Sequence, residues 1–214
     1  MSEQPEECTA SGGRLTARGR ATRARIVEAA AKLMLSRGVA ATSIPDVLAA
    51  AGVSASQLYH YFADKQDLVH AVITHSAQDE QQALGQVSLD SLEALRAWRD
   101  AVVALQQERN CAGGCVISLA GEIADVDPEA RAQLQATFAS WEESIRLGLT
   151  AMQERGEIRA DADPPRLALS VLAALQGGLL LTQVRRDTTP VEVALDTAID
   201  HIATFAADIS GARA

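Results

Sequence analysis

The sequence predicts an all-α protein, and three observations support that fold class. Of the 214 residues 48% are hydrophobic but only 3% are aromatic, and much of the apolar content is Ala and Leu. Both are strong helix formers. No segment alternates apolar and polar residues over the length of a strand. Helix start signals recur along the whole chain, so we expect about nine helices.

The chain begins with a tail and then a long helix. Residues 1–15 are polar and show no periodicity, which predicts a disordered tail. From Thr16 apolar residues recur at intervals of three and four, which predicts a helix that ends at Gly38. Four arginines crowd the start of this helix: Arg18, Arg20, Arg23 and Arg25.

Two short helices follow, each with its own start signal. Ser43 can cap the first, with Asp46 at the reciprocal position three residues on, and this helix stops at Gly52. Ser54 opens the second, with Gln57 in the same reciprocal place. The second helix is brief, and one tight turn separates the pair.

The later helices are longer, and residues typical of helix N-caps mark where several of them begin. Asp127, Asp163 and Thr189 each place a capping side chain before a proline at the first helical position. The predicted later helices cover about 65–83, 91–108, 115–125, 128–155, 164–185 and 190–209.

Charge is distributed unevenly along the chain. The net charge is −9, but residues 10–65 carry +5 and residues 66–214 carry −11. A basic segment before an acidic body suggests two roles in one chain, with the basic part suited to phosphate. An uneven but merely solvated surface would explain the same pattern.

Several classes of function lack their signals. No run approaches 18 apolar residues, so we expect no membrane span. The acidic N-terminus does not resemble a secretory signal, and three cysteines suit a reducing compartment, so we expect a cytoplasmic protein. Without a phosphate loop, a metalloprotease motif or a nucleophile elbow, we expect no enzyme, no catalytic residues and no cofactor. The four scattered histidines do not predict a metal site.

The stretch from Ile44 to Leu58 fits a helix-turn-helix. Gly52 tolerates the positive φ that the turn requires. Val47, Val53 and Leu58 would form the small core that sets the helix angle. The second helix could then enter the DNA major groove, although an ordinary helical corner remains the alternative.

The candidate DNA contacts surround this second helix. Hydroxyl groups before the first short helix can donate to phosphate, and residues of the second can reach phosphates or base edges. The predicted DNA-binding residues are Thr42, Ser43, Ser54, Ala55, Ser56, Gln57, Tyr59, His60, Tyr61 and Lys65.

The run from about Arg20 to Val72 resembles the DNA-binding domain of the TetR family of bacterial transcriptional repressors. Two positions depart from the family pattern: Leu48 stands where Ala is more usual, and Pro45 is less usual there. The matching positions are Gly38, Thr42-Ser43, Ala51-Gly52-Val53-Ser54, Leu58-Tyr59-His60-Tyr61-Phe62, Lys65 and Leu68.

The resemblance implies a domain division: a tail at 1–15, a three-helix DNA-binding domain at 16–64, and a larger helical ligand-binding and dimerisation domain at 65–214. It implies a homodimer through the helices at about 164–185 and 190–209. It also implies a repressor that a small ligand releases from a palindromic operator in double-stranded DNA. The first dimer helix is apolar nearly all round, which favours a partner on more than one face.

A small-molecule cavity is expected in the helical domain. Apolar and aromatic residues share helix faces there, which suits a mostly apolar effector, although plain hydrophobic core explains each residue as well. The candidate ligand contacts are Trp98, Val102, Leu105, Cys115, Leu119, Leu134, Phe138, Trp141, Leu172 and Gln176.

The stretch NCAGGCVISL, residues 110–119, holds two cysteines. We expect a helix break there, with Cys115 opening the next helix. The segment from Gly114 resembles a GCPxGxLA-like motif of one TetR subgroup, whose members often control drug-efflux or detoxification genes. A thiol-based redox or electrophile sensor acting through Cys115, with Cys111 as a second thiol, is the alternative function; a small buried hydrophobic residue is the plain reading of Cys115.

Overall fold

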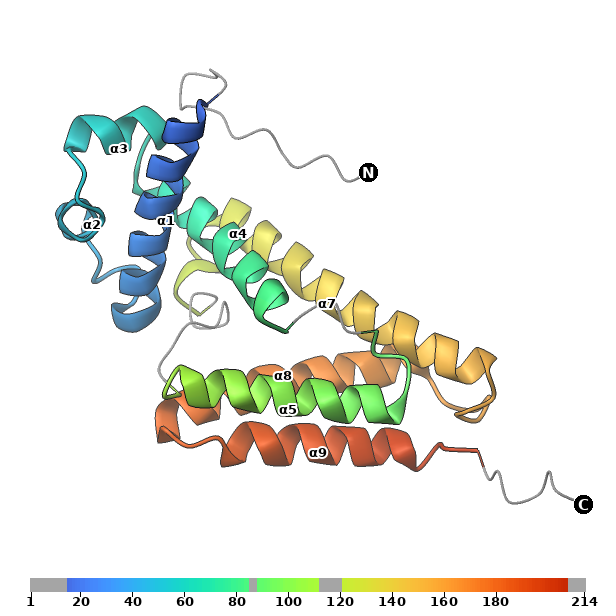
Figure 1. Ribbon diagram of the computed structural model, residues 1–214. Helices are drawn as coiled ribbons and strands as arrows, with labels where there is room; N and C mark the ends of the chain where they lie inside the picture. The colour runs from blue at the N-terminus through green and yellow to red at the C-terminus, as the bar shows by residue number, and fades with distance from the viewer. Residues whose placement is uncertain (1–14, 85–87, 112–120, 208–214) are drawn as a thin grey trace, which may run out of the picture. The chain divides into compact units, whose positions relative to one another are not determined.

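The structure, a computed structural model, describes residues 15–84, 88–111 and 121–207 (Figure 1). These residues are helical apart from their connections and one isolated β-bridge, between Ile158 and Ala206, so the predicted all-α class is confirmed. The helices are α1 (Ala17–Arg37), α2 (Ile44–Ala51), α3 (Ala55–Tyr61), α4 (Lys65–Leu84), α5 (Leu92–Glu108), α7 (Pro128–Glu154), α8 (Pro164–Arg185) and α9 (Thr189–Ala203).

The helices group into two compact units. The described residues of 1–79 and 114–134 form the first unit, and those of 80–113 and 135–214 form the second. The predicted domain boundary after residue 64 stays a prediction. The predicted tail at residues 1–14 lies outside the described residues, as does most of the helix predicted at 115–125, of which residues 121–123 are helical.

In the first unit, α1 supplies one wall of the core. Its apolar residues at intervals of three and four are buried, among them Ile26, Ala30 and Met34. Helix α1 packs against both α2 and α3. The core position of the periodic residues is the arrangement that the sequence pattern predicts for an amphipathic helix.

Asp127 ties the start of α7 to α4 within the same unit. Its carboxylate accepts hydrogen bonds from the N–H groups of Glu129 and Ala130 at 3.1 and 3.0 Å, and it lies 2.8 Å from Nε2 of His70. The hydrogen bond from the Ala130 N–H, followed by that from His70, lowers the pKa of Asp127. The buried carboxylate is therefore satisfied as a helix cap, as predicted.

In the second unit, α9 packs against both α8 and α5, which lie beside it in Figure 1. A Cβ at Gly178 of α8 would come within 2.8 Å of the Val191 Cα, so only glycine allows this approach of α8 to α9. The Thr182 hydroxyl oxygen then accepts a hydrogen bond from the Val191 N–H at 3.2 Å. This bond satisfies one of the free N–H groups at the start of α9.

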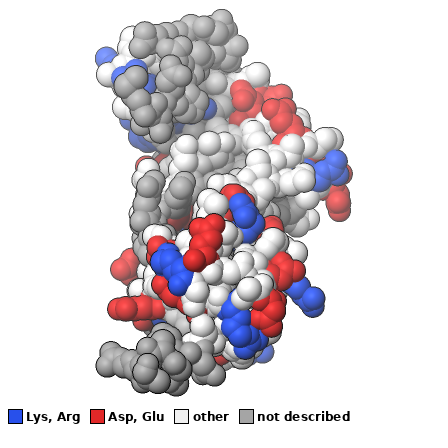
Figure 2. Space-filling model, turned by 90° about the vertical axis from the view of Figure 1, so that its right-hand side faces the viewer, with Lys and Arg blue, Asp and Glu red and all other residues white. Residues whose placement is uncertain are grey.

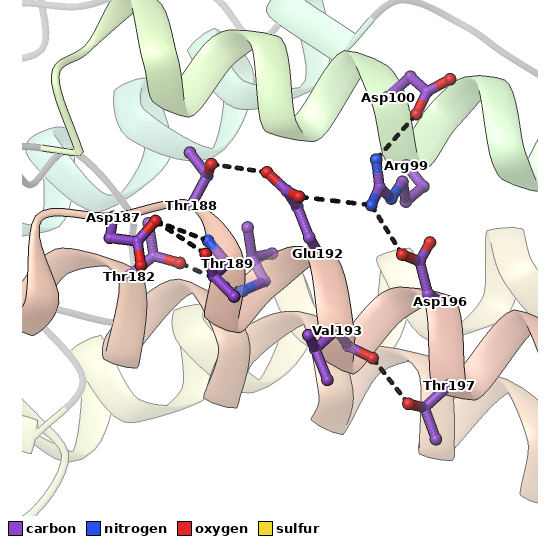
Figure 3. Close-up of polar contacts among 11 residues, drawn as sticks. Arg99, Asp100, Thr182, Asp187, Thr188, Thr189, Glu192, Val193, Asp196 and Thr197 are labelled. Atoms are coloured by element: carbon purple, nitrogen blue, oxygen red, sulfur yellow. Dashed lines mark hydrogen bonds and ion pairs between the residues drawn. The ribbon is translucent and has the colours of Figure 1, made fainter.

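Arg99 links α5 to α9 in the second unit (Figure 3). Its guanidinium lies 2.7 Å from Asp196 and 3.7 Å from Glu192, and it pairs with Asp100 at 3.0 Å. The hydrogen bond with Asp196 raises the pKa of Arg99. Acidic and basic side chains also lie close together on the face shown in Figure 2. The acidic partners lie toward the surface, where such pairs each contribute only about 0–1 kcal/mol, so they orient α5 and α9 more than they stabilise them.

Two predicted details of α9 are wrong. The helix ends at Ala203 rather than 209, because the chain beyond it pairs with residues 157–159: Phe205 accepts from the Arg159 N–H, and the Ala207 N–H donates to Glu157. Thr189 is the first helical residue and not the cap; its N–H and hydroxyl both donate to Asp187.

Within the described residues, only α8 is long and apolar enough to cross a membrane by length and composition. Half of its apolar window is buried inside the structure, and a core helix passes the same test of length and composition. The apolar character of α8 is therefore explained on one face by its packing on α9.

Candidate nucleic-acid interface

Helices α2 and α3 form a helix-turn-helix. Gly52 ends α2 in the left-handed conformation, with φ 63° and ψ 43°, and the chain turns directly into the start of α3. Val47 and Leu58 are completely buried, and Val53 is half-buried. The predicted small core therefore exists, and it fixes how α3 is presented to solvent.

Two arginines of α1 hold this motif in place. Arg25 donates from Nε to the Ala51 carbonyl at 3.0 Å, which satisfies one of the free carbonyls at the end of α2. Arg23 lies over the ring of Phe62, 5.1 Å from its centre, while the ring itself is fully buried. Both arginines were predicted only as part of a basic cluster.

Both predicted capping boxes are present. In the first, the Ser43 Oγ accepts from the Asp46 N–H at 3.3 Å and the Asp46 carboxylate accepts from the Ser43 N–H at 3.0 Å. In the second, Ser54 Oγ accepts from the Gln57 N–H at 3.2 Å and Gln57 Oε1 accepts from the Ser54 N–H at 2.9 Å. These boxes define where α2 and α3 begin.

The solvent face of α3 gathers most of the predicted DNA contacts. Tyr59 is 51% exposed, and Ser56 and His60 are also exposed. Tyr61 is half-buried, with its ring edge-on to that of His60 at 4.9 Å. Ser43, Ser54, Ala55 and Gln57 are exposed around the same motif.

Thr42 and Lys65 have internal partners. Thr42 is 1% exposed, and its hydroxyl donates to the Gly38 carbonyl at 2.8 Å. The Lys65 ammonium donates to the Val39 carbonyl at 2.6 Å, which leaves two of its three N–H bonds for other acceptors. In this structure Thr42 and Lys65 therefore both support the turn after α1.

Glu122 also holds the turn after α1, and no local sequence signal predicts it. Its carboxylate accepts from the N–H groups of Val39 and Ala40, at 2.9 and 3.2 Å, across more than 80 residues of sequence. Only the folded chain brings these groups together.

The candidate ligand residues on α5 and α8 lie in the second unit. Trp98, Val102, Leu172 and Gln176 are buried, and Leu105 is half-buried. A buried glutamine among apolar residues can supply a polar contact to an otherwise apolar ligand.

The remaining ligand candidates are more scattered. On α7, Leu134 is buried in the part counted with the first unit, while Phe138 and Trp141 are half-buried and meet edge to face at 5.7 Å. Cys115 and Leu119 lie outside the described residues.

Cys111 lies in the predicted break after α5. It is buried, with a positive φ of 50°, and its carbonyl accepts a hydrogen bond from Arg186 at 3.1 Å. Across the described ranges, no group of three or more His, Cys, Asp or Glu side chains is placed to hold a metal ion.

Family models match both parts of the chain. Residues 26–72 match the model for bacterial regulatory proteins of the tetR family, and residues 91–198 match the tetracyclin repressor-like C-terminal domain. The chain belongs to the TetR family. It is a DNA-binding transcriptional regulator of the repressor type and not an enzyme. The likeness to the GCPxGxLA subgroup stays a prediction.

Individual TetR-family proteins are similar over most of their length. An HTH-type transcriptional regulator of Mycobacterium tuberculosis is 30% identical, over 80% of this chain and 89% of that protein. The regulator TtgR of Pseudomonas putida is 29% identical, over 85% of this chain and 91% of that protein. A TetR transcriptional regulator of Chloroflexus aurantiacus is known from a crystal structure and is 29% identical to this chain. The two structures superpose with a TM-score of 0.78, over 89% of this chain and 98% of that one.

The left-handed turn at Gly52 gives a test of how α3 is held. An added Cβ would meet nothing within 4 Å, so Gly52→Ala introduces backbone strain without a clash. We expect it to lower the free energy of unfolding by about 1–2 kcal/mol, and Gly52→Asn to cost less because Asn tolerates this conformation. Urea denaturation measures both. An alanine variant as stable as the parent protein would show that the turn does not require glycine.

Proposed function

We propose that the protein is a homodimeric repressor that binds a palindromic operator through α3 of each copy and leaves it when a small, mostly apolar ligand binds. The observation that carries the dimer is an exposed apolar stripe on α8. Leu169, Leu180 and Val184 are 54, 47 and 73% exposed, on the face away from the buried residues of the same helix.

The stripe on α8 continues through small residues, and α9 also carries an exposed valine. Ala173 and Gly177, both exposed, lie between Leu169 and Leu180 at intervals of three or four residues. Val193 on α9 is 58% exposed. Small residues in the middle of an apolar stripe allow another helix to approach closely. A contiguous apolar face of this kind favours a protein partner, and the family resemblance favours a second copy.

Two-fold pairing also suits the size of the reading element. Helix α3 has seven residues, and one recognition helix contacts only a few base pairs. Two copies related by a two-fold axis would read two half-sites one helical turn apart. In this proposal α8 pairs with its copy rather than crossing a membrane, and the protein is cytoplasmic.

The ligand part of the proposal rests on the second unit. Trp98, Val102 and Leu172 offer apolar surface there, and Gln176 offers one amide. The ligand would shift the dimer toward a form with lower operator affinity. The size of this shift in the equilibrium cannot exceed the difference between the ligand's binding free energies for the two forms. The regulated genes in this proposal serve drug efflux, detoxification or metabolism. The thiol-sensor alternative stays a prediction, because Cys115 lies outside the described residues.

The dimer proposal predicts that Leu180→Glu separates the copies. A buried carboxylate on each side of a two-fold contact would be desolvated and would face its own copy. We expect a monomer by analytical ultracentrifugation. Affinity for an operator selected from random duplexes should fall by about 10²–10⁴-fold, because the two half-sites are no longer bound together.

Leu147→Glu is the matched control, because Leu147 on α7 is 54% exposed and lies outside the stripe. It should leave both the dimer and operator binding unchanged. If Leu180→Glu still sediments and binds as the parent protein does, the stripe is not the dimer contact.

The ligand proposal predicts that apolar compounds which raise the melting temperature also release the selected operator. Gln176→Leu should change which compounds act, whereas Gln107→Leu, at an exposed position of α5, should not. Fluorescence anisotropy of labelled operator measures release. Compounds that stabilise the protein but leave the operator bound would contradict ligand release.

A further inference from the structure

The two capping boxes of the helix-turn-helix differ in charge and in the hydrogens they leave free. In the first, the Ser43 hydroxyl donates to Asp46 at 2.5 Å, so its hydrogen is committed. That bond, followed by the one from the Ser43 N–H, lowers the pKa of Asp46. The first box is therefore ionised at neutral pH, and its hydroxyl hydrogen is already used.

The second box is neutral and leaves donors free. Gln57 Oε1 accepts from the Ser54 N–H at 2.9 Å. Only the amide oxygen can accept that hydrogen, so the oxygen is held at the backbone. Both Nε2–H donors stay at the exposed end of the side chain, and the hydrogen bonds of the described residues do not use them. No acidic residue lies in the first turn of α3.

We propose that Gln57 is a specificity-determining residue that reads one base pair in each half-site as a hydrogen-bond donor. Its target is a keto base, through O6 or N7 of guanine or O4 of thymine on the major-groove edge. The inference rests on the proposed entry of α3 into the major groove. It goes further by stating which end of the side chain reads and which class of base it selects.

The capping box turns the amide oxygen of Gln57 away from the position that the other common contact of glutamine requires. A bidentate contact with adenine uses the amide oxygen and the amide nitrogen together at the base edge. Here the oxygen is turned to the Ser54 N–H at 2.9 Å, so the nitrogen is the end of the amide that faces outward. Gln57 thus combines two functions: its oxygen fixes the start of α3, and its nitrogen faces the operator.

Gln57→Glu tests this division of roles. Glutamate has the same shape and is equally suited to a capping box, so the melting temperature should stay unchanged. The outward group becomes a carboxylate oxygen, which accepts hydrogen bonds and cannot donate them. Operator affinity should fall roughly 5- to 150-fold for each lost base contact.

Selection from a random duplex library decides the matter. The parent protein should select guanine or thymine at one position of each half-site. Gln57→Glu should switch that position to an amino base, cytosine or adenine, and leave the other positions unchanged. The control is Gln135→Glu, the same substitution at an exposed position of α7, which should alter neither affinity nor base preference.

An unchanged base preference in Gln57→Glu, with affinity either equal or uniformly lower, would overturn the inference, because Gln57 would then contact phosphate or nothing. Failure of the parent protein to select any two-fold sequence would instead overturn the proposed function itself. The two failures are therefore distinguishable in one experiment.

Discussion

Helix α3 is too short to exist alone, and its dependence on the rest of the fold shapes the whole first unit. Isolated helices below about 12 residues are marginal in water, and α3 has seven. It persists because Leu58 and the following Phe62 are fully buried and because Ser54 and Gln57 close its first turn. These contacts hold the helix in place, so the exposed side chains on its other face do not have to contribute to its stability.

The same constraint explains the polar contacts around the motif. Arg25 closes the end of α2, Lys65 and Thr42 bond the turn after α1, and Glu122 binds two N–H groups of that turn from far along the chain. Each bond engages a backbone group at a helix end or in the turn after α1. Many hydrogen bonds thus position the short helix α3. In the proposed dimer, a second copy of α3 allows the protein to contact a longer DNA sequence than one helix can.

The features of this arrangement that depend on neighbouring residues could be predicted from the sequence. The capping boxes at Ser43 and Ser54, the turn at Gly52 and the bounds of α8 follow from neighbouring residues, and the structure has them. The end of α9 and the role of Glu122 depend on partners about 50 and 80 residues away, which no local pattern encodes. The internal bond of Thr42 was missed for a related reason: a hydroxyl suited to phosphate is equally suited to a carbonyl.

The proposed function depends on the entry of two copies of α3 into the major groove of one duplex. Methylation interference on the selected operator tests it most directly, because methylation of guanine N7 blocks contacts in the major groove. The account predicts interference at two clusters of guanines about 10 base pairs apart, placed symmetrically about the operator centre. A single cluster, or interference confined to adenine N3 in the minor groove, would contradict it.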